Sequence, residues 1–320
     1  MIISAFRLIP QYHARVWGGQ RLQAADQPVG EAWIVFEDDV IADGPHAGRT
    51  LGALAAAEGQ SLLGRRPLRR TGLRMPLLIK LLDCQDWLSV QVHPNDEQAI
   101  ALEGQGQFGK TEAWHILEAQ PASEIIVGMA PGVSAEALAR AVRGAADGSL
   151  PGRAGLLPLM HNVPAAAGDT FFIRAGTLHA LGPGLLLYEV QQTSDITYRV
   201  WDWDRPAKAG RDLHVEKSLA VIDHALTGRA EPVRPQATPG VHALTACEYF
   251  ELQKLDASGG ALALHTRGES FHAVTALSGS VTVAGEGWSL ALGLFETAFV
   301  PAAVGAYAVT GGQALCALVP

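Results

Sequence analysis

The stretch that bears most directly on the fold reads Leu-Ser-Val-Gln-Val-His-Pro-Asn-Asp and spans residues 88–96. Polar and apolar residues alternate in it, and the side chains of a β-strand point alternately to opposite faces. We therefore predict a strand that carries Ser89, Gln91 and His93 on one face and ends at Pro94. Because nearby residues 77–82 are almost wholly apolar, this polar face is expected to point into the interior, where a metal ion or a polar ligand would use it.

Short strand-like segments separated by turn-forming residues recur along the whole chain. They fall at residues 33–36, 76–82, 87–93, 124–127, 170–173, 185–190, 272–277, 280–284 and 298–301. Helical patterns occur only as inserts, at residues 50–63, 134–143 and 215–226, and Ser134 is a good N-cap residue. Short strands at this spacing predict a mainly β fold of the β-sandwich or jelly-roll barrel type.

A proline-rich segment divides the chain. Residues 228–240 hold three prolines and no hydrophobic periodicity, which is typical of a linker. We therefore predict a first unit at residues 1–227 with a helical insert, this linker, and a second all-β unit at residues 241–320. A chain of 320 residues, nearly half of them apolar, is long enough for two such cores.

The composition limits the partners and the location of the protein. A net charge of −8 without any block of Lys or Arg argues against nucleic acid or an anionic membrane as partner, although a few local cations can still hold a phosphate. No apolar run reaches transmembrane length, and the N-terminus lacks the features of a signal peptide. Cys84, Cys247 and Cys316 are far apart, which predicts buried free thiols in a reducing compartment. We therefore expect a cytoplasmic protein; nothing in the sequence indicates its oligomeric state.

Three segments of the first unit offer metal ligands in strand contexts: residues 91–93, residues 109–114 with Glu112, and residues 168–179 with His179. Two imidazoles, a carboxylate and an amide oxygen suit a divalent metal such as zinc, with one position open for water or substrate. The absence of cysteine from this set favours a catalytic over a structural site. Residues 109–111, Gly-Lys-Thr, are not interpreted as a nucleotide-binding loop, because no hydrophobic strand precedes Gly104.

Several motifs in order along the chain resemble one known family. Residues 168–179 have the spacing of the second cupin signature, with Arg174 where proline is usual. The other matching pieces are Val-Trp-Gly-Gly at 16–19, Gly-Glu-Ala-Trp at 30–33, the 88–96 stretch, Gly-Lys-Thr-Glu-Ala-Trp at 109–114, Ala-Gly-Thr-Leu-His-Ala-Leu at 175–181 and Ser-Asp-Ile-Thr-Tyr-Arg-Val-Trp-Asp-Trp-Asp-Arg at 194–205. Together they resemble the type I phosphomannose isomerases, and residues 271–302 extend the resemblance to nearly the whole chain.

The resemblance implies two cupin-type β-barrels with short helical inserts. We interpret the second barrel as metal-free, since it has no histidine where the first has His179. It also implies one Zn²⁺ per chain and a set of site residues. The implied metal ligands are Gln91, His93, Glu112 and His179; the catalytic residues are Arg199, Glu189 and Lys110; and the substrate-binding residues are Ser89, Lys110 and Arg199.

The expected activity is that of an aldose–ketose isomerase, which interconverts mannose 6-phosphate and fructose 6-phosphate by metal-assisted proton transfer through an enediolate. Glu189 is the favoured base, with His179, Lys110 or a metal-bound water as alternatives. A metal-dependent cupin dioxygenase, which would hold iron, and a non-catalytic sugar-binding cupin are alternative functions. If the protein is the isomerase or the sugar-binding cupin, its expected partner is a small sugar phosphate.

Two further features are interpreted as structural. The alternating Trp and Asp residues at 201–204 are expected to place two indoles on one strand face and two carboxylates on the other, where arginines would pair with them. His115 is expected to be a packing residue and not an additional ligand.

Overall fold

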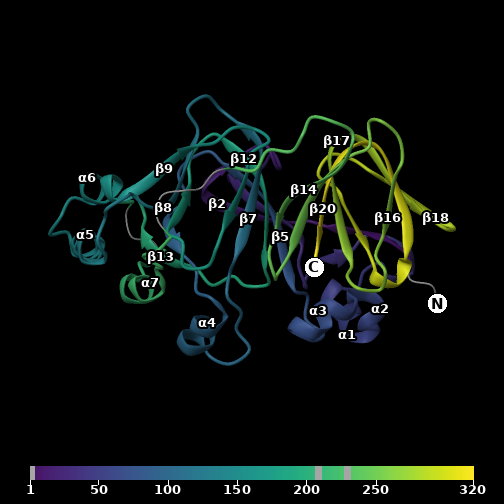
Figure 1. Ribbon diagram of the computed structural model, residues 1–320, viewed down its shortest axis with the longest axis horizontal. Helices are drawn as coiled ribbons and strands as arrows, with labels where there is room; N and C mark the ends of the chain where they lie inside the picture. Colours follow the sequence, from purple (N-terminus) through teal and green to yellow (C-terminus); the bar gives the residue numbers. More distant parts are fainter. Residues whose placement is uncertain (1–3, 206–210, 227–231) are drawn as a thin grey trace.

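The computed structural model describes residues 4–205, 211–226 and 232–320 of the chain. Within these residues the strands form three sheets with antiparallel pairing. Two sheets face each other in one barrel, and the third curls into a second barrel beside it (Figure 1). The prediction of a mainly β fold built from two cupin-type barrels is confirmed.

Sheet I is buried on both faces along β5, β12 and β3, where every residue is buried. Its strands, in spatial order, are β10 (Thr170–Ile173), β7 (Glu112–Ala119), β12 (Leu185–Gln192), β5 (Leu77–Cys84), β2 (Gln11–Gly19) and β3 (Val29–Val35). Along β5, Leu82 and Cys84 point into the first barrel, while Ile79 and Leu81 pack toward the second. Burial on both faces accounts for the nearly continuous apolar sequence of this strand.

Sheet II forms the opposite wall of the first barrel. Its strands are β13 (Tyr198–Trp201), β6 (Val90–Val92), β11 (His179–Leu181), β8 (Glu124–Met129) and β9 (Met160–Pro164). On β6, Val90 and Val92 pack outward against the helical insert, and Gln91 points to an internal cavity. The predicted alternation is confirmed, and the ladder ends before Pro94 as expected.

Sheet III forms the second barrel. Its strands are β14 (Gly240–Ala246), β15 (Glu251–Asp256), β20 (Ala306–Leu318), β17 (His272–Gly285), β19 (Thr297–Val300), β1 (Phe6–Ile9) and β4 (Val40–Ile41), with β16 (Leu262–His265) on β20 and β18 (Trp288–Leu292) on β17. The N-terminal strand β1 pairs with β19, so the start of the chain adds strands to this sheet. The division into residues 1–227, 228–240 and 241–320 stays a prediction, and residues 228–231 lie outside the described residues.

The helices cover the outside of the barrels (Figure 1). They are α1 (Leu51–Glu58), α2 (Gln60–Leu63), α3 (Arg65–Thr71), α4 (Asp96–Glu103), α5 (Ala135–Asp147), α6 (Gly152–Leu156) and α7 (Val215–Val221), with short 3₁₀ turns at Gly44–His46, Leu157–Leu159 and Ala302–Val304. Among the described helices, none is long and apolar enough to span a membrane.

The three predicted helical segments are confirmed with changed ends. Ser134 caps α5, accepting a hydrogen bond from Ala137 N, and the helix runs on to Asp147. Residues 50–63 form two helices, because the chain breaks at Gly59, where φ is 48°. The helix expected at 215–226 ends at Val221, while α3, α4 and α6 were not predicted.

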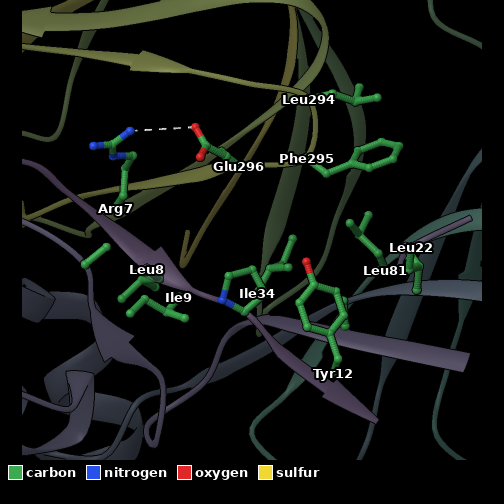
Figure 2. A pocket seen from close by; sticks show the side chains of 13 residues that line it. Arg7, Leu8, Ile9, Tyr12, Leu22, Ile34, Leu81, Leu294, Phe295 and Glu296 are labelled. Carbon is green, nitrogen blue, oxygen red and sulfur yellow. Dashed lines mark ion pairs between the residues drawn. The ribbon is translucent and has the colours of Figure 1, made fainter. Parts of the chain in front are cut away.

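An apolar cavity of about 300 Å³ lies where β1, sheet I and the turn between β18 and β19 meet. Figure 2 shows Ile34 and Leu81 of sheet I on one side of it and Phe295 on the other. Arg7 and Glu296 at its edge approach each other to 3.9 Å, and Arg7 also pairs with Asp43. Arg7 and Glu296 are paired and most of the remaining lining is apolar. We therefore interpret this cavity as a packing gap between the barrels and not as a catalytic site.

Candidate active site

Sheets I and II bring two histidines and a glutamate together inside the first barrel. His93 follows β6 and His179 begins β11 in sheet II, while Glu112 begins β7 in sheet I. One ligand atom from each lies within 4.8 Å of the others, and all three side chains are buried. It is the one such group of His, Cys, Asp or Glu side chains in the described part of the chain.

The hydrogen bonds of the two imidazoles fix their tautomers. His93 Nδ1 lies 2.9 Å from Ile196 O, and His179 Nδ1 lies 2.8 Å from Thr177 O. Because a carbonyl oxygen can only accept, each Nδ1 donates its hydrogen and each Nε2 presents a lone pair. These Nε2 atoms lie 3.5 Å and 3.3 Å from the two carboxylate oxygens of Glu112. All four atoms are buried without a hydrogen-bond partner.

Four buried acceptor atoms that face one another repel unless a cation lies between them. Protonated imidazoles do not provide it, because burial lowers the pKa of His179 to about 4 and, together with Lys110 and His179, holds that of His93 well below its ordinary value. Neutral Nε2 atoms and a carboxylate are ligands of divalent metals, and a backbone carbonyl on Nδ1 is the usual outer contact of a metal-binding histidine. The residues present therefore fit a divalent metal ion.

Strand pairing places Gln91 beside this group. Gln91 is directly opposite His179 on β11 and directly opposite Arg199 on β13. Residues directly opposite in an antiparallel pair share a face of the sheet. On the inward face of sheet II, Gln91 therefore lies between His179 and Arg199, and its side-chain amide is next to both of them.

Lys110 lies between Glu112 and the cavity. Its Nζ is 3.1 Å from Glu112 Oε2, an ion pair without the alignment of a hydrogen bond, and only 4% of the residue is exposed. Burial alone would lower the pKa of this lysine, but the carboxylates of Glu112 and Glu189 outweigh it and raise the pKa above its ordinary value. The two carboxylates therefore favour the charged form of this buried lysine.

Glu189 projects from β12 into the same space. Its Oε2 accepts a hydrogen bond from Trp114 Nε1 at 3.0 Å, and its Oε1 lies 3.8 Å from Lys80 Nζ. Burial, followed by the charge of Glu112, raises the pKa of this carboxyl, whereas Lys110 and Lys80 oppose the rise. Burial that raises the pKa of a carboxyl is one way in which proteins prepare a catalytic acid or base.

A line of charged side chains runs from Glu189 through Lys80 to Glu31 on β3 and Arg15 on β2. Glu31 accepts hydrogen bonds from Arg15 at 3.0 and 3.2 Å and from Trp33 Nε1 at 2.8 Å, and lies 3.8 Å from Lys80 Nζ. Burial would raise the pKa of Glu31, but Lys80 and Arg15 outweigh it and hold the pKa at about 2. Lys80 therefore lies between two ionised or ionisable carboxylates on neighbouring strands.

These groups line a cavity of about 570 Å³. Its charged lining residues are Arg15, Lys80, Lys110, Arg199 and Arg211 against Glu31, Glu189 and Asp195. The excess of cations inside a protein of net charge −8 marks the cavity as a site for a small anion.

Arg199 brings one of these cations from β13 of sheet II. Its Nη1 donates to Asp212 O at 3.0 Å, while its buried Nε has no hydrogen-bond partner among the described residues. Burial and the nearby Arg211 lower its pKa, but an arginine remains charged at neutral pH. The guanidinium of Arg199 lines the cavity and is a charged donor for a phosphate or an oxyanion.

All the site residues expected from the sequence lie in or next to this cavity. Ser89, Gln91, Lys110, Glu189 and Arg199 line it, and the group of His93, Glu112 and His179 adjoins it through Lys110. The sequence reasoning missed Lys80, Glu31 and Arg15. A lone lysine within the apolar residues 77–82 was a visible signal, because a charge on a doubly buried strand needs a partner.

The two features interpreted as structural are also accounted for. His115 is buried, and its Nδ1 lies 2.9 Å from Thr170 Oγ1. Asp202 pairs with Arg205 and Arg211 as expected, whereas Asp204 accepts a hydrogen bond from Trp201 Nε1 at 2.7 Å. The predicted strand alternation at residues 201–204 is wrong, however, because Trp203 has a φ of 58° and the strand ends at Trp201.

Comparison with known proteins assigns the family. Residues 5–112 match the family model "Phosphomannose isomerase type I, catalytic domain". The mannose-6-phosphate isomerase of Streptococcus mutans is 34% identical over 297 residues, 88% of each chain, and ManA, a mannose-6-phosphate isomerase of Bacillus subtilis, is 36% identical over 265 residues, 79% of each chain. A crystal structure of the mannose 6-phosphate isomerase from Bacillus subtilis matches with a TM-score of 0.84 and 28% identity, covering 99% of both chains. The chain therefore belongs to the type I phosphomannose isomerase family.

Proposed function

We propose that this protein interconverts mannose 6-phosphate and fructose 6-phosphate with one Zn²⁺ held by His93, Glu112, His179 and Gln91. The observation that carries the metal is the set of four buried acceptor atoms from His93, Glu112 and His179 that face one another without hydrogen-bond partners. The curated relatives are isomerases, so the dioxygenase and the non-catalytic sugar-binding cupin are not favoured.

The charge of the cavity supports a sugar phosphate as substrate. A phosphate group carries about two negative charges near neutral pH, and the lining has more cations than carboxylates. Arg199 and Lys110, which both line the cavity, would bind the phosphate or the developing enediolate. Ser89, which is almost fully buried at the wall, would contact the phosphate.

The chemistry needs a proton to move between C1 and C2 of the sugar. A divalent metal at the histidine pair would act as a Lewis acid that polarises a sugar oxygen. Glu189 would accept and return the proton, since burial raises its pKa toward the working pH and Trp114 fixes its orientation. Lys110 and Arg199 would stabilise the negative charge that develops on the oxygens.

We also propose a cytoplasmic location, which the free cysteines support. The expectation that all three cysteines are buried is wrong for Cys247, which is partly exposed, whereas Cys84 and Cys316 are buried. The assignment of residues 1–227 as the catalytic unit and 241–320 as a metal-free cupin remains part of the same proposal.

The experiment that tests the proposal joins metal analysis to a coupled assay with mannose 6-phosphate, before and after chelation. We expect one zinc per chain, loss of isomerase activity with the chelator, and its return on adding zinc. Bound iron together with oxygen uptake would support the dioxygenase, and a metal-bound protein without turnover would support the binding protein.

The role of Glu189 is tested by Glu189→Gln, which keeps the shape of the side chain and removes the basic oxygen. We expect a variant that retains zinc and loses turnover by about 10²-fold or more, the usual contribution of a general base. Near-normal turnover with zinc bound would eliminate Glu189 and leave His179, Lys110 or a metal-bound water as the base.

A further inference from the structure

The segment that carries Lys110 is held by groups outside it. Residues 104–111 form the loop from α4 into β7, and Lys110 and Glu112 stand at its end. Every backbone N–H from Gly109 to Thr111 is donated to a different partner: Gly109 N to Asp96 Oδ1 at 2.7 Å, Lys110 N to Pro94 O at 3.0 Å, and Thr111 N to Gln192 Oε1 at 2.9 Å. The backbone next to the metal-ligand group is thus fixed residue by residue.

Asp96 is the centre of these contacts. Its Oδ1 accepts from Gly109 N and also from Gln192 Nε2 at 3.0 Å, and its Oδ2 accepts from Tyr249 Oη at 3.2 Å. Gln192 uses both ends of its amide, because its Oε1 accepts from Thr111 N. The approach is close: a Cβ on Gly109 would lie 2.6 Å from Asp96 N, so only glycine fits there.

Tyr249 reaches this centre from the second barrel. It lies in the turn between β14 and β15 of sheet III, and its ring lies 4.8 Å below the guanidinium of Arg70. Sheet III contributes no ligand to the group of His93, Glu112 and His179, so a hydrogen bond from Tyr249 to Asp96 is a route by which the second barrel acts on the site.

We infer that Asp96, Gln192 and Tyr249 form a clamp that positions Lys110 and Glu112, and that the second barrel supports the active site through Tyr249. The inference rests on the proposed function for its catalytic readout. None of the three clamp residues lines the cavity that would hold the substrate, so they are positioning residues. Loosening the clamp lets residues 109–111 move relative to the histidines, which weakens both substrate binding by Lys110 and metal binding by Glu112.

The test compares Tyr249→Phe and Asp96→Ala with the wild type. We expect KM for mannose 6-phosphate to rise about threefold and about tenfold, respectively, because misplacing a positioned group costs up to about 10²-fold. Zinc should leave both variants faster in the presence of a chelator. Hydrogen exchange of the peptide covering residues 104–111 should also be faster, a readout that requires no activity.

Three controls separate positioning from general destabilisation. Tyr307→Phe removes a hydroxyl of the second barrel that bonds His272 Nδ1 at 2.6 Å and not a clamp residue, and it should leave KM and the exchange of residues 104–111 unchanged. Asp96→Asn keeps an acceptor for Gly109 and should restore most of the loss seen in Asp96→Ala. In the Asp96→Ala background, Tyr249→Phe should have no further effect on KM, since coupled residues are not additive.

The outcomes also separate this inference from the proposed function. Wild-type protein without isomerase activity refutes the proposed function, and the exchange measurement still tests the clamp. An active wild type whose KM, zinc release and loop exchange are unchanged in both Tyr249→Phe and Asp96→Ala refutes the clamp alone.

Discussion

Replacing Glu31 by Gln tests whether the buried charges at the floor of the site stabilise the fold. Glu31 is 9% exposed and ionised between Arg15, Trp33 and Lys80. Glutamine has the same shape and keeps an oxygen that accepts from Trp33. The substitution therefore removes one negative charge with little change in packing, and it leaves Lys80 with Glu189 as its remaining acidic neighbour.

The pKa of Glu31 gives the size of the effect. It is lowered from 4.5 to about 2, chiefly by Lys80 and Arg15 against the opposing effect of burial. Since one pH unit corresponds to about 1.4 kcal/mol, the ionised carboxylate contributes about 3 kcal/mol to the free energy of unfolding at neutral pH. A carboxyl with a lowered pKa stabilises above its unfolded pKa, and this stabilisation is lost as the pH falls from 4.5 toward 2. The gap between wild type and Glu31→Gln should therefore shrink to about 1.5 kcal/mol at pH 3.

Urea unfolding followed by tryptophan fluorescence at pH 7, 5, 4 and 3 measures the gap. A chelator in every sample keeps metal release from adding to it. Glu216→Gln is the matched control, because Glu216 pairs with Arg143 on the surface and exposed pairs contribute little; its stability should follow the wild type at each pH. A gap that stays constant from pH 7 to pH 3, or widens toward acid, would refute the reasoning.

Two further predictions concern the metal and the helical insert. Glu112→Gln should lower zinc affinity by more than about 100-fold, because losing even an outer contact of a metal site can cost that much. The measurement is the metal content after dialysis against a chelator, and one zinc per chain would contradict the assignment of Glu112 as a ligand. Ser134 is the N-cap of α5, and its Oγ accepts a hydrogen bond from Ala137 N at 3.2 Å. Ser134→Ala removes this cap and should lower the free energy of unfolding by about 1 kcal/mol. Because α5 packs outside sheet II, the same variant should keep its kcat/KM, and a changed value would contradict that placement.

The sequence predicted the parts of the site that follow from local pattern. Alternation at residues 88–93 placed Gln91 on the inward face, and the structure has Val90 and Val92 packed on the outward one. The spacing of residues 168–179 likewise predicted a histidine after a turn, and His179 begins β11. These features depend on a few consecutive residues, which is why they are readable without a fold.

The line of charges from Glu189 to Arg15 could not be predicted in this way. Lys80 meets Glu189 because β5 and β12 pair in one register, and it meets Glu31 because β3 lies on the other side of β5. The clamp has the same origin, since Asp96 and Tyr249 are 153 residues apart in the chain. Such contacts depend on strand order and on the docking of two barrels, and neither is encoded in a local pattern.

Sheet I separates the polar site from the apolar core along its strands. One inward-facing row across the sheet contains the site residues Trp114, Glu189 and Lys80 as direct neighbours. The next inward-facing row is apolar and contains Ile116, Leu187 and Leu82. The cost of burying charges is thereby confined to one end of the barrel, where the cations and carboxylates offset one another and the cavity gives access to a substrate. A slip of β12 by one residue would replace Glu189 on the inward face by Tyr188 or Val190 and would turn the glutamate toward the apolar contact with the second barrel. Because that alternative buries an unpaired charge, the double burial of sheet I specifies the register of β12 and the position of Glu189 together.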